Sequence, residues 1–346
     1  MSLKKLIIIV AIVLFLGVLV LVKALVQKKQ DTRQEIAQEQ ATELALTKGI
    51  PESQVSKITL YKGDDEKNKV IFTKDSAGAW RLASQFDVRA KKESIEGILN
   101  AAGDLKGQLR GESKEVFADF AIEDKDCAHI VIDDALGRPW YHLVVSFLRL
   151  DWDKTFVRLA GSQKVALVQR DILSSLNLYN KEGKLEYVNF ADLKVCLFDA
   201  AKIQKIELAS LINKTSKTLV LKKSAAKEGD PLVWNFQPPA AKGEDIDVSK
   251  VDEFLRNISN LYAKDVADPQ GTGLGFDSPT LELTLEDSDG QGLFQLEVGK
   301  YVAAEKLYYL KSSSPDQVFK VSDADIQNLR KEKAYFLKPK ETKKKK

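Results

Sequence analysis

The sequence repeats one series of strand and helix signals twice. Val55–Leu60 (VSKITL) reappears as Ile203–Leu208 (IQKIEL). A β-branched run, a tryptophan-centred strand and an amphipathic helix then recur in the same order. The matching pairs are Lys69–Lys74 with Thr218–Lys223, Trp80 with Trp234, and the helix of Ile95, Ile98, Leu99 and Leu105 with that of Val251, Phe254, Leu255 and Leu261. Two copies of one mixed unit indicate a scaffold or binding surface more than a single catalytic pocket.

A long apolar segment precedes the repeats. Residues 6–26 contain one charged side chain, Lys23, which can extend to the lipid headgroups. A helix needs about 20 apolar residues to cross a bilayer. The alternative, a cleaved signal peptide, requires a small-residue cleavage site, and residues 23–28 (KALVQK) contain no clear one. We therefore expect residues 1–27 to form an uncleaved anchor, with residues 6–26 in the cytoplasmic membrane.

The charges beside this segment leave its orientation open. Lys4 and Lys5 precede the unbroken apolar run of residues 6–22, and Lys23, Lys28, Lys29 and Arg33 follow that run. The positive-inside rule compares these two groups, and long domains translocate largely regardless of them.

The composition of the chain after this apolar segment is typical of an ordinary globular protein. Charged residues make up 30% of the chain, and the net charge is only +3. This balance argues against a nucleic-acid partner, which requires clustered positive charge. Cys127 and Cys196 are the only cysteines, so a disulfide framework is excluded. One disulfide or two separate buried thiols both remain open.

The domain boundaries follow from the repeat and from helix-breaking residues. Residues 28–50 are polar and are expected to form a partly helical stalk, which Pro51 ends. Repeat one is assigned to residues 51–189 and repeat two to residues 190–338. Residues 339–346 form a basic tail, expected to be disordered, which a membrane with anionic headgroups would attract.

Strand signals dominate each repeat. Alternation with period two predicts strands, and 3.6-residue spacing predicts two helices per repeat. Asp289-Gly290 between two alternating runs predicts a hairpin. The predicted fold class is α+β: two tandem repeats of a mostly antiparallel sheet with packed helices, preceded by one N-terminal transmembrane helix.

Two segments carry a resemblance to a known family. Phe156–Ser162 (FVRLAGS) leads into Val165–Val168, and Gly273–Leu285 (GLGFDSPTLELTL) continues the pattern in repeat two. The chain resembles the bacterial family called domain of unknown function 4340 over nearly all of its length after residue 50. It departs from the pattern at Phe120–Asp124, which replaces the glycine- and proline-bearing turn of repeat two.

The resemblance implies a location and a class of partner. Proteins of this family are typically membrane-anchored with an extracytoplasmic bulk, so the soluble domains are expected outside the inner membrane of a bacterium. Their genes often accompany ABC-type export systems of the kind associated with gliding motility. ABC transporter subunits are therefore the expected partners. The family has no established catalytic residues, so none is assigned here.

Motifs for catalysis are lacking. Cys127, His129 and His142 could supply three zinc ligands, but no fourth ligand is in sight, and side chains on the surface of a hairpin are the alternative. Acidic clusters fit turns better than a catalytic pair. Gly271–Gly275 precedes a strand, so it lacks the helix N-terminus that binds phosphate. We expect no enzyme activity, no metal and no cofactor.

Tryptophans supply the one candidate contact residue. Trp80 and Trp234 occupy equivalent repeat positions and are expected in the core. Trp152, between Asp151 and Asp153, is the candidate for contact with a ligand or partner. The leading hypothesis is a non-catalytic accessory or scaffold protein of an ABC-type transport assembly. The alternative is a module that binds envelope glycan or lipid in the cleft between the repeats.

Overall fold

The computed structural model describes residues 43–65, 68–212, 215–225, 230–239, 241 and 244–339. The predicted anchor at residues 1–27 and the tail from residue 340 onward lie outside the described residues. No helix in the described part is long and apolar enough to cross a bilayer. The chain divides into two compact units, Met1–Lys69 with Ile95–Leu185 and Val70–Ser94 with Glu186–Lys346.

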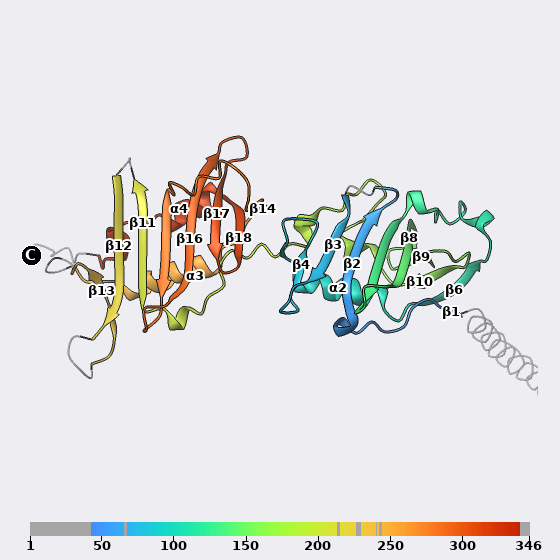
Figure 1. Cartoon of the computed structure of the whole chain (residues 1–346), viewed down its shortest axis with the longest axis horizontal. Coiled ribbons are helices and arrows are strands. Elements are labelled where there is room, and N and C mark those ends of the chain that lie inside the picture. Colours follow the sequence, from blue (N-terminus) through green and yellow to red (C-terminus); the bar gives the residue numbers. More distant parts are fainter. Residues whose placement is uncertain are drawn as a thin grey trace, which may run out of the picture. The chain divides into compact units, whose positions relative to one another are not determined.

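Ten strands form the first sheet (Figure 1). In spatial order they are β1 (Glu43–Ala45), β6 (Lys106–Gly111), β10 (Val165–Gln169), β9 (Lys154–Leu159), β8 (Pro139–Asp151), β7 (Ala128–Asp134), β2 (Val55–Lys62), β3 (Val70–Lys74), β4 (Trp80–Leu82) and β5 (Val88–Arg89). Cross-strand partners place Ile58, Ile132 and Leu143 on one buried face.

Eight strands form the second sheet. Their order is β13 (Val233–Gln237), β12 (Thr215–Ser224), β11 (Lys205–Ile212), β15 (Leu281–Glu286), β16 (Gly292–Val302), β17 (Leu307–Ser313), β18 (Asp316–Ser322) and β14 (Asp265–Ala267). Position by position, this order equals β4, β3, β2, β7, β8, β9, β10 and β6 of the first sheet. The duplication predicted from the sequence is therefore a duplication of topology, and the fold is mainly β with some helix.

Helices occupy equivalent places in the two repeats. α2 (Lys92–Ala102) follows β5, and α3 (Val248–Ser259) precedes β14. α4 (Asp323–Leu329) in repeat two corresponds to the 3-10 turn η5 (Leu173–Leu176) in repeat one. The other 3-10 turns are η1 (Glu52–Gln54), η3 (Lys114–Val116), η4 (Asp124–Asp126), η6 (Tyr187–Asn189), η7 (Ala200–Lys202) and η8 (Lys333–Phe336). The predicted apolar faces of α2 and α3 are buried.

A fully buried phenylalanine follows the last strand of each repeat. Phe190 packs edge-on against Phe72, with 5.7 Å between ring centroids, and Phe336 packs edge-on against Phe254 at 5.4 Å. The backbone bonds also correspond. Lys91 N donates to Phe190 O, as Asp247 N donates to Phe336 O, at 2.7 and 2.8 Å. Each bond joins the closing segment to the residue at the start of the repeat's long helix.

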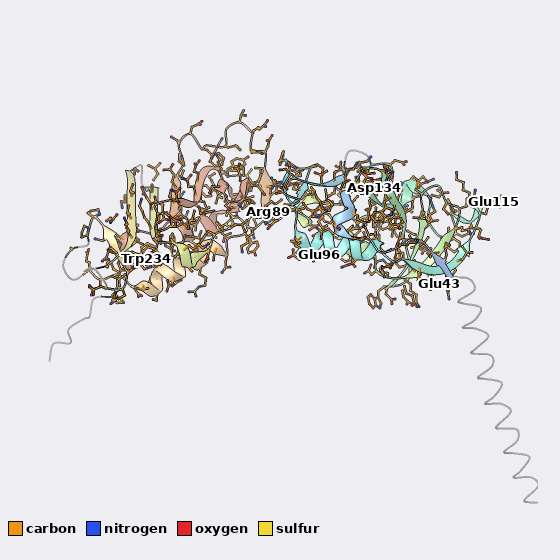
Figure 2. All side chains as sticks on the ribbon, turned by 60° about the horizontal axis from the view of Figure 1, so that its bottom comes forward. Glu43, Arg89, Glu96, Glu115, Asp134 and Trp234 are labelled. Atoms are coloured by element: carbon orange, nitrogen blue, oxygen red, sulfur yellow. The ribbon has the colours of Figure 1, made fainter. Side chains whose placement is uncertain are left out.

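The predicted stalk is wrong in its last residues. Glu43–Ala45 forms the edge strand β1, which pairs with β6, where a partly helical stalk was expected. Leu46 and Thr47 are buried, and the Thr47 hydroxyl donates to Ala102 O at 2.6 Å. Three residues are too few to show the alternation from which strands are predicted, so long-range pairing decides their structure. Trp80 is buried, and so is Trp234 (Figure 2), as predicted.

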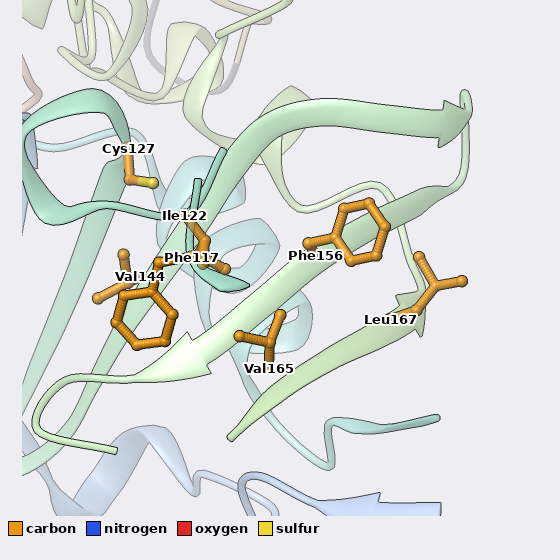
Figure 3. Packing of buried hydrophobic residues seen from close by; sticks show 7 residues of the cluster. All are labelled: Phe117, Ile122, Cys127, Val144, Phe156, Val165 and Leu167. Atoms are coloured by element: carbon orange, nitrogen blue, oxygen red, sulfur yellow. The ribbon is translucent and has the colours of Figure 1, made fainter. Parts of the chain in front are cut away.

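A second core lies on the other face of the first sheet (Figure 3). Residues 112–127 cover this face. The cluster consists of Phe117, Ile122, Cys127, Val144, Phe156, Val165 and Leu167. In repeat two, Leu274 reaches the sheet closely enough to accept a 2.7 Å hydrogen bond from Lys300 N.

Gly299 on β16 permits that close approach. A Cβ added there would lie 2.2 Å from Leu274 O. We predict that Gly299→Ala pushes this carbonyl away and lowers the free energy of unfolding by about 1–3 kcal/mol, measured by urea denaturation. The control is Gly97→Ala in α2, where a Cβ would meet nothing within 4 Å and should stabilise by about 0.5–1 kcal/mol. Equal stability of the two variants would contradict this account.

Candidate functional site

The hairpin formed by β8 and β9 presents apolar side chains to solvent. Leu148, Leu150 and Trp152 are 40%, 58% and 75% exposed. We call these three residues the hairpin surface. β7 pairs with β8 only as far as Val145, so no residue of β7 pairs with residues 146–151. This end of β8 therefore combines exposed apolar groups with a strand edge that β7 leaves open.

Ser146 holds the base of the hairpin. Its side chain is fully buried, and its hydroxyl lies 2.9 Å from both Phe120 O and Ala121 O. The same oxygen accepts a 3.0 Å bond from Leu148 N. The pairing of β8 with β9 shifts between Val145 and Arg149. A bulge of this kind redirects side chains at a strand end.

Arg149 holds the tip. Its guanidinium forms a 3.2 Å ion pair with Asp171 and donates to Trp152 O at 3.3 Å. Lys154 pairs with Asp151 at 2.9 Å across the turn. Trp152 is therefore exposed on a turn whose backbone is tied to the body of the unit. The sequence singled out Trp152 but missed Leu148 and Leu150. The alternation of Leu148, Leu150 and Trp152 along the sequence was the available signal.

The two histidines meet on the sheet face that carries the second core. His129 is 2% exposed, and its ring stacks on Tyr61 with 4.3 Å between centroids. His129 Nε2 lies 2.8 Å from Asp124 O, and its Nδ1 lies 3.1 Å from His142 Nε2. The Tyr61 hydroxyl lies 3.1 Å from that same His142 nitrogen. The alternative prediction, that the His129 side chain lies exposed on a β-hairpin, is therefore wrong.

These contacts define the tautomers of the neutral rings. Asp124 O can only accept, so His129 Nε2 carries the hydrogen and its Nδ1 accepts from His142 Nε2. Burial lowers the pKa of His129 below its ordinary value of 6.5. Burial, followed by the charge of His129, lowers the pKa of His142. Hydrogen bonds therefore fix the orientation of each ring.

Cys127 does not join the histidines as a ligand. Its thiol lies 3.4 Å from Ala121 O and belongs to the second core, and burial raises its pKa to about 12. The thiolate that binds metal is thereby disfavoured. Among the described residues, no three His, Cys, Asp or Glu side chains are grouped to hold a metal ion. Cys127 and Cys196 are both free and buried.

The acidic clusters and the glycine-rich segment that the sequence analysis considered lie in turns and loops. Asp287 Oδ1 accepts from Asp289 N and Gln291 N in the β15–β16 hairpin, at 2.9 and 3.0 Å. Asp134 makes the same bonds in the β7–β8 turn. These acids therefore cap turns, as expected. Gly271–Gly275 precedes β15 and opens no helix.

Comparison with models of protein families shows to which family this chain belongs. The model of the family described as Domain of unknown function (DUF4340) matches residues 80–274, more than half of the chain. The chain belongs to this family. No curated protein and no solved structure matches it. The DUF4340 match begins at β4 and ends before β15, so it includes parts of both repeats, and the hairpin surface lies within it.

The histidine pair predicts a pH dependence. The unfolded chain protonates its histidines near pH 6.5, whereas burial keeps the folded ones neutral to lower pH. The unfolded state therefore binds more protons as pH falls, and stability decreases below pH 6.5, by at most about 1.4 kcal/mol per pH unit for each histidine. The chain has only two histidines, so His129→Gln with His142→Gln should flatten this slope. Urea melts between pH 7.5 and 5 measure it, and an unchanged slope would refute the assignment.

Proposed function

We propose that this protein is a membrane-anchored, non-catalytic accessory protein that binds a protein partner through the hairpin surface. The family resemblance supplies the partner class, subunits of an ABC-type transport assembly at the bacterial cell envelope. Anchoring through residues 6–26, with the repeats on the extracytoplasmic side, would keep the hairpin surface close to such an assembly. The observation that carries the proposal is the exposure of Leu148, Leu150 and Trp152 on one hairpin.

The chemistry of the hairpin suits a protein contact. Tryptophan is enriched among the residues that dominate binding energy at interfaces. Clustered exposed apolar side chains are unfavourable in water unless a partner covers them. The bonds from Arg149 to Trp152 O and to Asp171 hold the tip in place before binding. A held tip loses less conformational entropy when it binds.

The strand edge adds a second means of recognition. Residues 146–151 extend past the last pair between β8 and β7. An extended segment of a partner can add to such an edge through backbone hydrogen bonds, while side-chain contacts supply specificity. Trp152 at the end of this edge is placed to make those contacts.

The test is co-purification of the full-length protein from its native membrane in mild detergent, followed by mass spectrometry. Wild type should recover ABC permease and ATPase subunits in stoichiometric amounts. Trp152→Ala with Leu150→Ser should weaken the complex by at least about 2 kcal/mol, about thirtyfold in affinity. Recovery of those subunits would then fall to background.

The matched control is Leu136→Ser in the β7–β8 turn. Leu136 is 75% exposed, as Trp152 is, but lies at the other end of β8. This variant should co-purify the partner as wild type does. Equal recovery by all variants would remove the hairpin surface from the interface. Recovery of the wild-type protein alone would contradict the accessory role and favour the glycan- or lipid-binding alternative.

A further inference from the structure

Repeat two has an open pocket of about 410 Å³. Residues of β11, β12 and β13 line one side of this pocket, and residues 331–333 line another. Its volume falls within the range of small-molecule sites, about 300–1,000 Å³. The apolar floor includes Leu208, Leu219 and Phe236. All of its lining residues belong to one compact unit.

In repeat one, other residues of the same repeat fill the position that is equivalent to this pocket. Lys62 on β2 occupies the position that Ser210 has on β11, because each lies two residues beyond an equivalent leucine, Leu60 or Leu208. The Lys62 amine donates to Lys181 O and, at 2.8 Å, to Gly183 O. Those carbonyls belong to the long connection of residues 177–186 between η5 and η6.

Repeat two lacks both of these features. Residues 330–332 alone connect α4 to η8, and a serine replaces the lysine. The pocket is therefore the space that the connection and the lysine occupy in the other copy.

Ser210 is a buried polar group that lines this pocket. It is 5% exposed, and its hydroxyl has no protein hydrogen-bond partner in the described part of the chain. Lys217 lies directly opposite it in the β11–β12 ladder. A ligand in the pocket can therefore bond to this hydroxyl without displacing a protein hydrogen bond of the described residues.

Lysine side chains lie at the opening of the pocket. Three lysines and one carboxylate line the pocket, namely Lys217, Lys331, Lys333 and Glu332. Lys217 pairs with Glu332 at 3.3 Å, and Lys333 pairs with Glu244 at 2.7 Å. The Lys331 amine lies over the Tyr335 ring and has no carboxylate partner among the described residues. One cation thus remains uncompensated at the rim.

We infer that this pocket binds a small amphipathic anion, an acyl chain with a carboxylate or phosphate head. The chain lies on Leu208, Leu219 and Phe236. The anionic oxygens accept hydrogen bonds from the Ser210 hydroxyl and from the amines of Lys217 and Lys331. This site adds a ligand to the proposed protein-contact role and does not depend on that role.

The test is photolabelling of the full-length protein in nanodiscs with a diazirine analogue of dodecanoate, followed by peptide mapping. Labels should map to residues 205–239 and 331–333. Dodecanoate and dodecyl phosphate should both compete with the probe, whereas dodecanol and dodecyltrimethylammonium should not. Stronger competition by dodecanoate than by lysophosphatidate would assign the ligand as a free fatty acid, and the reverse order would assign a membrane lipid.

Two single substitutions test the head-group contacts. Ser210→Ala and Lys331→Glu should each lower the apparent affinity about tenfold, and Ser210→Ala should leave the melting temperature unchanged or higher. Ser216→Ala, on the exposed face of β12, and Lys311→Glu, on β17, are the matched controls and should label as wild type does. Labelling outside the pocket, or labelling that neither pocket variant changes, would overturn the proposal.

Discussion

One aromatic contact closes each copy of the fold. Phe190 and Phe336 arrive after the last strand of their repeats, are fully buried, and accept the backbone N–H of the residue at the start of the long helix. Loss of such a buried ring costs about 3–5 kcal/mol. In both copies the backbone bond joins the closing segment to the start of the long helix, while the ring packs on Phe72 of β3 in one copy and on Phe254 of α3 in the other.

The two copies share a common frame, and the two proposed sites lie where the copies differ. The β8–β9 turn carries Trp152, whereas residues 303–306 (AAEK) connect β16 to β17. Tyr301, near that second turn, packs its ring on Tyr308 at 4.8 Å. Conversely, the pocket beside Ser210 is open where Lys62 and residues 177–186 close repeat one. The exposed tryptophan turn thus belongs to repeat one alone, and the pocket beside Ser210 to repeat two alone.

The sequence predicted the elements with strong local patterns. The long strands, the apolar faces of α2 and α3, and the buried pair Trp80 and Trp234 follow from periodicity and from the repeat. The short strands β1, β5 and β14 contain two or three residues, so distant pairing determines them and local pattern does not. The histidine cluster was also missed, because hydrogen bonds between neighbouring strands depend on register, which a single sequence leaves open.

Polar groups that already have protein hydrogen-bond partners stabilise the fold, whereas polar groups without such partners can bond to a ligand. Tyr61, His129 and His142 have the residue types of a catalytic cluster, yet the Tyr61 hydroxyl, both His129 nitrogens and His142 Nε2 bond to each other or to Asp124 O. Such a network of hydrogen bonds rigidifies a core. The Ser210 hydroxyl has the opposite arrangement, since it lines a pocket and has no protein hydrogen-bond partner among the described residues. A ligand can therefore bond to Ser210 without breaking a hydrogen bond of the described fold, whereas binding at the histidines would break one.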